Sequence, residues 1–107
     1  MTLPPLLQTY FAAQNMHDID RLVACFAPDA RVRDEGADII GRQQIRAWKE
    51  KVRDKYHLVI DPLHHRQEDE RDFVTARIEG TFPGSPIELT YQFGFKDGQI
   101  VSLEVLS

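Results

Sequence analysis

The hydrophobic pattern of the chain changes its period about halfway along, and this change constrains the fold more than any other feature. Before Leu58, most apolar residues recur three or four positions apart, the spacing that places them on one stripe of a helix. From Leu58 onward they alternate with polar residues, as in strands that bury one face. Helices followed by antiparallel strands predict an α+β domain whose strongly curved sheet wraps its apolar face around the helices.

We expect three helices and one short strand in the front half. The first helix is predicted to end at about Asn15, and the second to be capped by Asp18 and stopped by Pro28. The short strand is predicted at 30–34. A loop bounded by Gly36 and Gly41 follows, and the third helix ends near His57. The apolar stripe of the third helix consists of Ile45, Trp48, Val52 and Tyr56. We expect Lys49, like the other charged residues of this helix, to lie on its solvated side.

Four strands are predicted in the back half, at 58–67, 74–82, 87–95 and 100–106. Pro62 lies in the first of them and favours an edge strand or a bulge. The element order is therefore α-α-β-α-β-β-β-β. A curled sheet that covers only three helices leaves a cone, and the open end of a cone is a natural pocket for a small apolar molecule.

Length and charge exclude several classes of protein. A chain of 107 residues has room for one domain, spanning residues 1–107. With 13 basic and 17 acidic residues, the net charge of −4 disfavours nucleic acids and anionic membranes as partners. Cys25 is the sole cysteine, so no intramolecular disulfide can form, and we expect a cytoplasmic protein. The uncharged stretch 2–17 is too short and too polar to span a bilayer.

Metal and cofactor sites are not expected. His64 and His65 are adjacent on a predicted strand, so their side chains point to opposite faces and cannot share one metal ion. One of them could still line the pocket. Neither a glycine-rich phosphate loop nor a nucleophile elbow is present, so we expect no cofactor.

Three polar residues interrupt the inward, apolar phase of their elements: Tyr10, Asp34 and Tyr91. An aspartate on such a phase is costly unless it is hydrogen-bonded or its pKa rises, and a raised pKa suits a base or acid that works near neutrality. Tyrosine hydroxyls are strong neutral donors. The alternatives are that each tyrosine is a core residue whose hydroxyl reaches the surface, and that Asp34 lies at a frayed strand end and caps the loop.

Several segments resemble one known family. They are 8–15 (QTYFAAQN), 18–23 (DIDRLV), 26–32 (FAPDARV), and Gly41 followed by 45–48 (IRAW). Together they are similar to the opening of SnoaL-like proteins of the NTF2-like superfamily. The resemblance implies a cone-shaped fold and a homodimer that pairs through the outer face of the sheet.

Within that superfamily, the nearest catalytic pattern is that of ketosteroid isomerase. The resemblance implies Asp34 as the base that moves a proton and Tyr10 as a donor to the oxyanion. Tyr91 stands where the isomerases carry a protonated acid, and Glu35-Gly36 replaces the proline that commonly follows the base. The expected pocket walls are Phe11, Val32, Trp48, Phe82 and Phe93.

Three functions remain open at this level. The first is a cofactor-independent isomerase that acts next to the carbonyl of a steroid- or polyketide-like substrate. The second is a non-catalytic module that binds a ligand or dimerises. The third is polyketide-cyclase-like chemistry, which would call for an acid on a late strand inside the cavity; Glu88 and Glu104 are the acids there, and their phase is outward or ambiguous.

Overall fold

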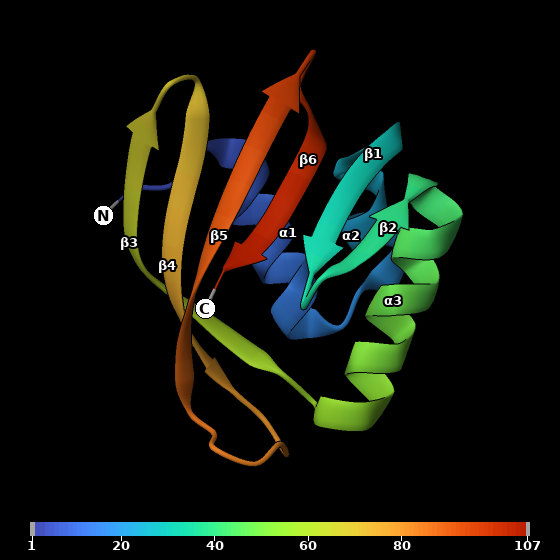
Figure 1. Cartoon of the computed structure of the whole chain (residues 1–107), viewed down its shortest axis with the longest axis vertical. Helices are drawn as coiled ribbons and strands as arrows, with labels where there is room; N and C mark the ends of the chain where they lie inside the picture. The colour runs from blue at the N-terminus through green and yellow to red at the C-terminus, as the bar shows by residue number, and fades with distance from the viewer. Residues whose placement is uncertain (1, 107) are drawn as a thin grey trace.

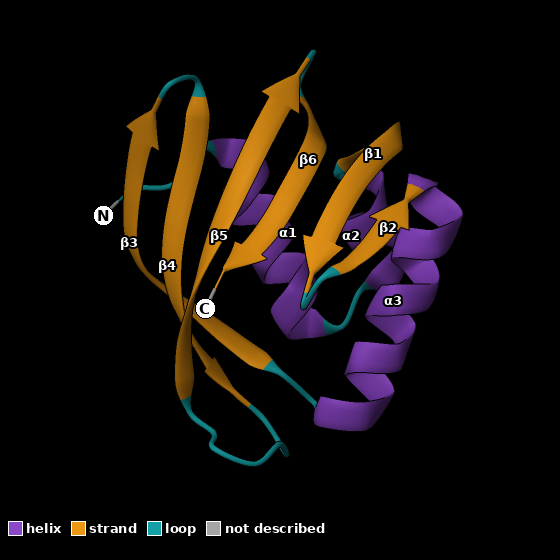
Figure 2. Ribbon diagram, in the orientation of Figure 1, coloured by secondary structure: helices purple, strands orange, loops and turns teal. Residues whose placement is uncertain are grey.

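Three helices lie on one face of a six-stranded, curved sheet in the computed structural model, which describes residues 2–106 (Figures 1 and 2). The elements are α1 (Pro5–Met16), α2 (Ile19–Ala24), β1 (Phe26–Asp34), β2 (Ala37–Ile40), α3 (Gly41–Tyr56), β3 (Val59–Glu68), β4 (Arg71–Glu79), β5 (Ile87–Lys96) and β6 (Gln99–Leu106). The strands are ordered β2-β1-β6-β5-β4-β3. The predicted α+β cone is confirmed.

The second helix is shorter than the sequence pattern predicts. Asp18 caps it as expected, since its carboxylate accepts a hydrogen bond from the Arg21 amide at 3.2 Å. The helix ends at Ala24, however, and Phe26 already belongs to β1, so the prediction that Pro28 stops this helix is wrong. The cause is a long-range contact, because the Cys25 carbonyl accepts a hydrogen bond from the Ile100 amide of β6.

The predicted loop between Gly36 and Gly41 contains the extra strand β2. Glu35 and Gly36 both have positive φ, at 52° and 79°, and form the two-residue turn of a tight hairpin between β1 and β2. Helix α3 follows at once from Gly41. The hairpin places Asp34 at the end of a paired strand and beside a turn.

The sheet is not antiparallel throughout. Strand β1 pairs with β6 in parallel, with Val32 opposite Leu103. The remaining neighbours are antiparallel. Edge strand β3 shifts its register between Pro62 and His64, which confirms the prediction made from Pro62.

The connection between β4 and β5 packs against the end of α3. Strand β4 ends at Glu79, so Phe82 lies in the connection and not in a strand as predicted. The Thr81 amide donates a hydrogen bond to the Tyr56 carbonyl at 2.8 Å. At Gly80 a Cβ atom would lie 2.6 Å from the same carbonyl oxygen, so only glycine permits this approach. The contact closes one end of the space between α3 and the sheet.

The core fills the rest of the concave face. The side chains of Leu7, Phe26, Ile45 and Phe93 are fully buried there. Helix α1 is held to β3 by Asn15, whose amide group both donates to and accepts from the backbone of Ile60, at 2.8 and 2.7 Å. Within the described residues, every helix is too short or too polar to cross a bilayer.

Candidate functional site

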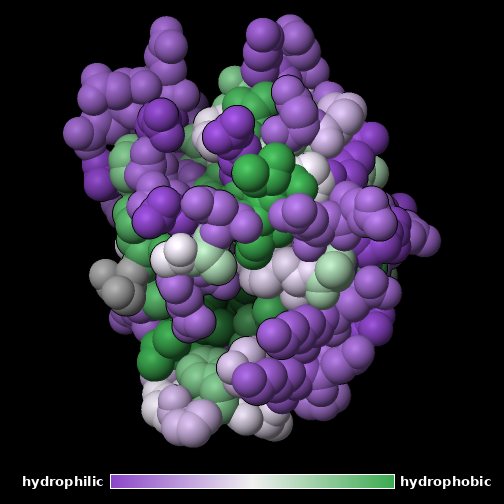
Figure 3. Space-filling view, turned by 45° about the vertical axis from the view of Figure 1, so that its right-hand side comes forward, coloured by the Kyte–Doolittle hydropathy of each residue, from purple (hydrophilic) through white to green (hydrophobic). Residues whose placement is uncertain are grey.

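A cavity of about 350 Å³ lies between α3, α1 and the curved end of the sheet. Figure 3 shows apolar side chains gathered around a hollow in the lower part of the face in view. The apolar lining residues are Trp48, Val52, Leu58, Ile60, Ile78, Phe82, Pro83, Ile87, Leu89 and Val105. The polar ones are Tyr10, Gln14, Asp34, Glu35, Lys49, Tyr56 and Tyr91. Few polar groups in an apolar wall are typical of a site for a small organic molecule.

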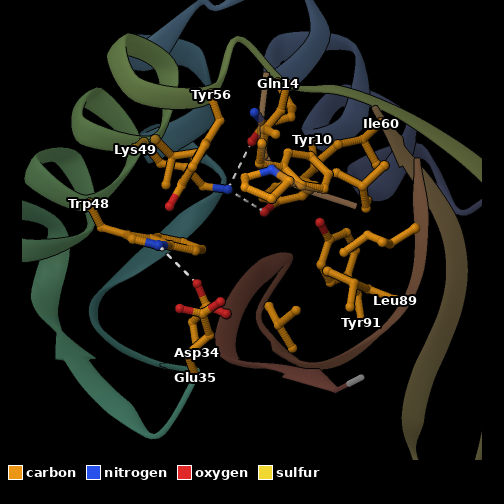
Figure 4. Close-up of a pocket in the computed structure, with 17 residues that line it drawn as sticks. Tyr10, Gln14, Asp34, Glu35, Trp48, Lys49, Tyr56, Ile60, Leu89 and Tyr91 are labelled. Carbon is orange, nitrogen blue, oxygen red and sulfur yellow. Dashed lines mark hydrogen bonds between the residues drawn. The ribbon is translucent and has the colours of Figure 1, made fainter. Parts of the chain in front are cut away.

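The three polar residues predicted from their phase meet in this cavity. Tyr10 comes from α1, Asp34 from the end of β1 and Tyr91 from β5, and Figure 4 shows them arranged around one open space. Trp48 and Phe82, predicted as walls, also line it. Elements far apart in sequence therefore bring the predicted acid and both phenols to one place.

Asp34 is half-buried, and one of its oxygens is held by the protein. The Trp48 indole N–H donates a hydrogen bond to Asp34 Oδ2 at 3.3 Å, and Figure 4 draws no hydrogen bond to the other oxygen. Desolvation raises the pKa of Asp34, and the neighbouring Glu35 carboxylate adds to this rise, against the opposing effects of the Trp48 bond and the Lys49 charge. A carboxylate with a raised pKa is a stronger base.

Lys49 is buried in the site and not solvated, so the prediction for this residue is wrong. Its side chain is only 5% exposed. The ammonium donates to the Tyr10 hydroxyl and to Gln14 Oε1, both at 2.8 Å, and lies 4.1 Å from the centre of the Trp48 ring. Desolvation lowers the pKa of Lys49 to about 7, although the Asp34 charge acts to raise it.

The two phenols differ in their surroundings. The Tyr10 oxygen accepts the hydrogen bond from Lys49, which leaves the hydrogen of its own hydroxyl for another acceptor. Figure 4 draws no hydrogen bond to the Tyr91 hydroxyl, which points into the open space. Burial raises the pKa of both phenols above its ordinary value, so both stay protonated and act as neutral donors.

Three of the predicted walls lie in the core and do not line the cavity. Phe11, Val32 and Phe93 are each at most 3% exposed. Phe11 stacks on the Tyr91 ring at 5.7 Å, and Phe93 meets the Tyr10 ring edge-on at 5.3 Å between centroids. These two phenylalanines therefore fix the orientation of the phenols from behind.

Sequence reasoning missed several polar lining residues, although a signal for some of them was present. Lys49 lies four positions after Ile45 and three before Val52, which places it on the buried stripe of α3. Gln14 likewise lies on the stripe of α1. Glu35 lies in the turn between β1 and β2 and lines the cavity from there, and the alternation along a strand does not report the direction of a turn residue.

No histidine contributes to the cavity. His65 instead forms a pair with Asp72, with 2.8 Å between Nε2 and Oδ2, at a different part of the β3–β4 ladder. Across residues 2–106 no cluster of three or more His, Cys, Asp or Glu side chains has the geometry of a metal site. The polar groups that line the cavity are two carboxylates, an amine, an amide and three phenols.

Solved structures provide close matches to this fold. A candidate polyketide cyclase from Sinorhizobium meliloti is 41% identical with a TM-score of 0.93, covering 96% of this chain and 94% of that one. A protein of ketosteroid isomerase-like fold from Catenulispora acidiphila, in complex with trimethylamine, is 20% identical with a TM-score of 0.86, covering 99% and 87%. An epoxide hydrolase/cyclase-like enzyme of salinomycin pyran-ring formation is 21% identical with a TM-score of 0.84, covering 94% and 86%.

No curated protein gave a significant match. The model of the SnoaL-like domain matches residues 7–103, nearly the whole chain. The folds of its structural neighbours are described as ketosteroid isomerase-like and NTF2-like. The family match identifies the chain as a member of the SnoaL-like domain family, with a cavity sized for a small molecule.

Proposed function

We propose that this protein is a cofactor-independent enzyme that moves a proton at the carbon next to a carbonyl group of an apolar, steroid- or polyketide-like substrate. The observation that carries the proposal is that the half-buried Asp34 carboxylate shares one apolar cavity with the hydroxyls of Tyr10 and Tyr91. A base and two neutral donors are the groups that enolate formation requires.

In the proposed step, the oxygen of Asp34 that Trp48 does not hold removes the proton from the α-carbon. The electron pair of the C–H bond moves toward the carbonyl, whose oxygen becomes an enolate oxygen. Tyr10 and Tyr91 donate hydrogen bonds to that oxygen, and Lys49 strengthens Tyr10 as a donor by hydrogen-bonding to its oxygen. Where a carbon–carbon double bond of the substrate is conjugated with the enolate, Asp34 then returns the proton to the far carbon of that double bond. The double bond moves, which completes an isomerisation.

A cyclisation would begin with the same proton removal. The enolate carbon would then form a bond to the carbon of a second carbonyl of the same molecule, and the π bond of that carbonyl would open to an alkoxide. Asp34 would return its proton to the alkoxide oxygen, with the phenols as hydrogen-bond donors as before. The similarity to a candidate polyketide cyclase at 41% identity supports a polyketide-like substrate class. Among the described residues, the acids that line the cavity are Asp34 and Glu35, and neither lies on a late strand. We assign the base of either reaction to Asp34, whose pKa is raised by desolvation.

The experiment is deuterium exchange, because it reports proton removal whatever the final product. A panel of enolisable cyclic ketones is incubated with the protein in D₂O, and proton NMR follows the loss of the α-hydrogen signal. We expect catalysed exchange for at least one ketone, and a loss of about 10² to 10⁴ in rate for Asp34→Asn. Asp38→Asn is the matched control, since Asp38 is an exposed carboxylate on β2.

Two outcomes would contradict the proposal. The first is exchange by Asp34→Asn within about tenfold of the wild-type rate, since a positioned base contributes more than that. The second is binding of ketones to the wild-type protein without any catalysed exchange, which would support the alternative of a non-catalytic ligand-binding module.

A further inference from the structure

Lys49 is a buried amine that has no ionic partner. Its two hydrogen-bond acceptors, the Tyr10 hydroxyl and the Gln14 side-chain carbonyl, are both neutral. Among the side chains of residues 2–106, no carboxylate forms an ion pair with it. A buried ammonium without a carboxylate partner is costly, so the environment favours the neutral amine.

The polar groups that share the cavity with Lys49 come from two helices and two strands, while β3, β4 and β6 contribute apolar side chains. They are Tyr10 and Gln14 of α1, Asp34 and Glu35 at the end of β1, Trp48 and Tyr56 of α3, and Tyr91 of β5. Of these, the Asp34 carboxylate attracts the ammonium and acts to raise its pKa. Desolvation outweighs this attraction, because the pKa of Lys49 falls to about 7. About half of the molecules therefore carry the neutral amine at pH 7.

The neutral Lys49 amine is placed to act as a nucleophile. A primary amine has two hydrogens, and the two acceptors of Lys49 can take both of them. The nitrogen lone pair is then uncommitted, on a side chain that lines a cavity with a mostly apolar wall. Desolvated lysines of this kind attack carbonyl carbons.

We propose that Lys49 is a second reactive group of the cavity, which condenses with the carbonyl of small apolar aldehydes and ketones to form a Schiff base. The amine lone pair forms the C–N bond, and one amine hydrogen moves to the carbonyl oxygen, which gives a carbinolamine. The second hydrogen leaves with the hydroxyl group as water, and the C=N bond forms. The Tyr10 hydroxyl, within hydrogen-bond distance of the nitrogen, can relay these protons.

This activity goes beyond the proton transfer assigned to Asp34 and does not depend on it. Benzaldehyde distinguishes Schiff-base formation by Lys49 from proton transfer by Asp34, because it has a carbonyl group but no hydrogen on the adjacent carbon. It can form a Schiff base with Lys49 but cannot be a substrate for exchange by Asp34. Failure of one proposal therefore leaves the other open to its own test.

The experiment is reductive trapping with benzaldehyde and sodium cyanoborohydride on the full chain, at a series of pH values. The reagent delivers hydride to the C=N carbon, solvent supplies the proton to nitrogen, and the resulting secondary amine is permanent. Proteolysis and mass spectrometry then locate the benzyl group. The other lysines, Lys51, Lys55 and Lys96, are internal references in the same sample.

At pH 7 we expect Lys49 to be labelled at least about tenfold faster than the reference lysines, whose side chains are exposed and whose amines are therefore not desolvated. Its labelling should rise with pH to a midpoint near 7. In the urea-unfolded chain, Lys49 and Lys51 should react alike. Lys51→Arg should leave the labelling of Lys49 unchanged, and Lys49→Met should lose the fast-reacting site.

Locating the benzyl group on the lysines of the wild-type chain tests the proposal even if Lys49→Met does not fold. Labelling of Lys49 at pH 7 that is absent, or no faster than that of Lys51, would overturn the proposal. So would a Lys49 midpoint that coincides with that of the exposed lysines, since the cavity would then give its amine no special reactivity.

Discussion

The Lys49 ammonium donates a hydrogen bond to the Tyr10 hydroxyl, with 2.8 Å between nitrogen and oxygen. This contact joins α3 to α1 inside the cavity and fixes the direction of the phenol (Figure 4). Because Tyr10 accepts this bond through its oxygen, it can donate its own hydrogen only to something else. The open space beside it, with Asp34 on the far side, is where a ligand oxygen would lie.

Tyr10→Phe should reduce both activity and stability. The substitution removes an expected oxyanion donor, which costs on the order of 10² to 10³ in rate. It also leaves Lys49 with one acceptor fewer in a buried site, which should lower the free energy of unfolding by about 1 to 3 kcal/mol. Deuterium exchange and urea unfolding measure the two effects. Unchanged stability would show that the bond to Lys49 contributes nothing measurable.

Tyr91→Phe is the matched variant, with a different expected result. Figure 4 draws no hydrogen bond to the Tyr91 hydroxyl, so its removal should change the free energy of unfolding by less than about 0.5 kcal/mol. Exchange should still slow by on the order of 10² if the hydroxyl binds the enolate oxygen. An exchange rate equal to that of the wild type would remove Tyr91 from the proposed machinery.

Lys49 should make the stability of the protein depend on pH above neutrality. Its pKa is about 7 in the folded chain and near 10.4 when unfolded, so between these values the unfolded chain binds more protons. The free energy of unfolding contributed by Lys49 therefore rises as pH increases from about 7 to about 10. Compared with Lys49→Met, the wild type should gain on the order of a few kcal/mol over this range. Urea unfolding at each pH measures the difference, and parallel curves for the two proteins would contradict it.

Gly80→Ala should destabilise the closed end of the cavity. The added Cβ would lie 2.6 Å from the Tyr56 carbonyl oxygen and 2.7 Å from Leu58 Cδ2, so β4 and α3 would have to separate. The hydrogen bond from the Thr81 amide to Tyr56 would weaken with them. We expect a loss of about 1 to 3 kcal/mol in thermal or urea unfolding. A melting curve identical to that of the wild type would show that this approach is not tight in solution.

Local patterns in the sequence predict most of the fold, and the departures come from contacts between distant residues. The cap at Asp18, the end of α3 before His57 and the irregular edge at Pro62 follow from short-range rules. The early end of α2 depends on a bond between Cys25 and β6, which periodicity does not report. The parallel pairing of β1 with β6 is of the same long-range kind.

The site was predictable in outline, since the phase of each element identified Tyr10, Asp34 and Tyr91 as cavity residues. The charge of Lys49 predicts an exposed side chain, but its spacing from Ile45 places it on the buried stripe, and the spacing decides its position. The assignment of Phe11 and Phe93 as walls failed because phase shows that a side chain faces inward but not how deep it lies. The homodimer and the cytoplasmic location stay predictions, the first of which sedimentation would test.

The state of Asp34 is the most direct test of the account, because the proposed chemistry requires a desolvated carboxylate inside the cavity. Carbon-detected NMR can follow the titration of this one carboxyl group in the ligand-free protein. We predict a pKa above the reference of about 3.9, and a lower value in Glu35→Gln, which removes a neighbouring negative charge. A pKa at or below about 3.9 in the wild type would mean that desolvation does not dominate the titration of Asp34, and would contradict its role as the base.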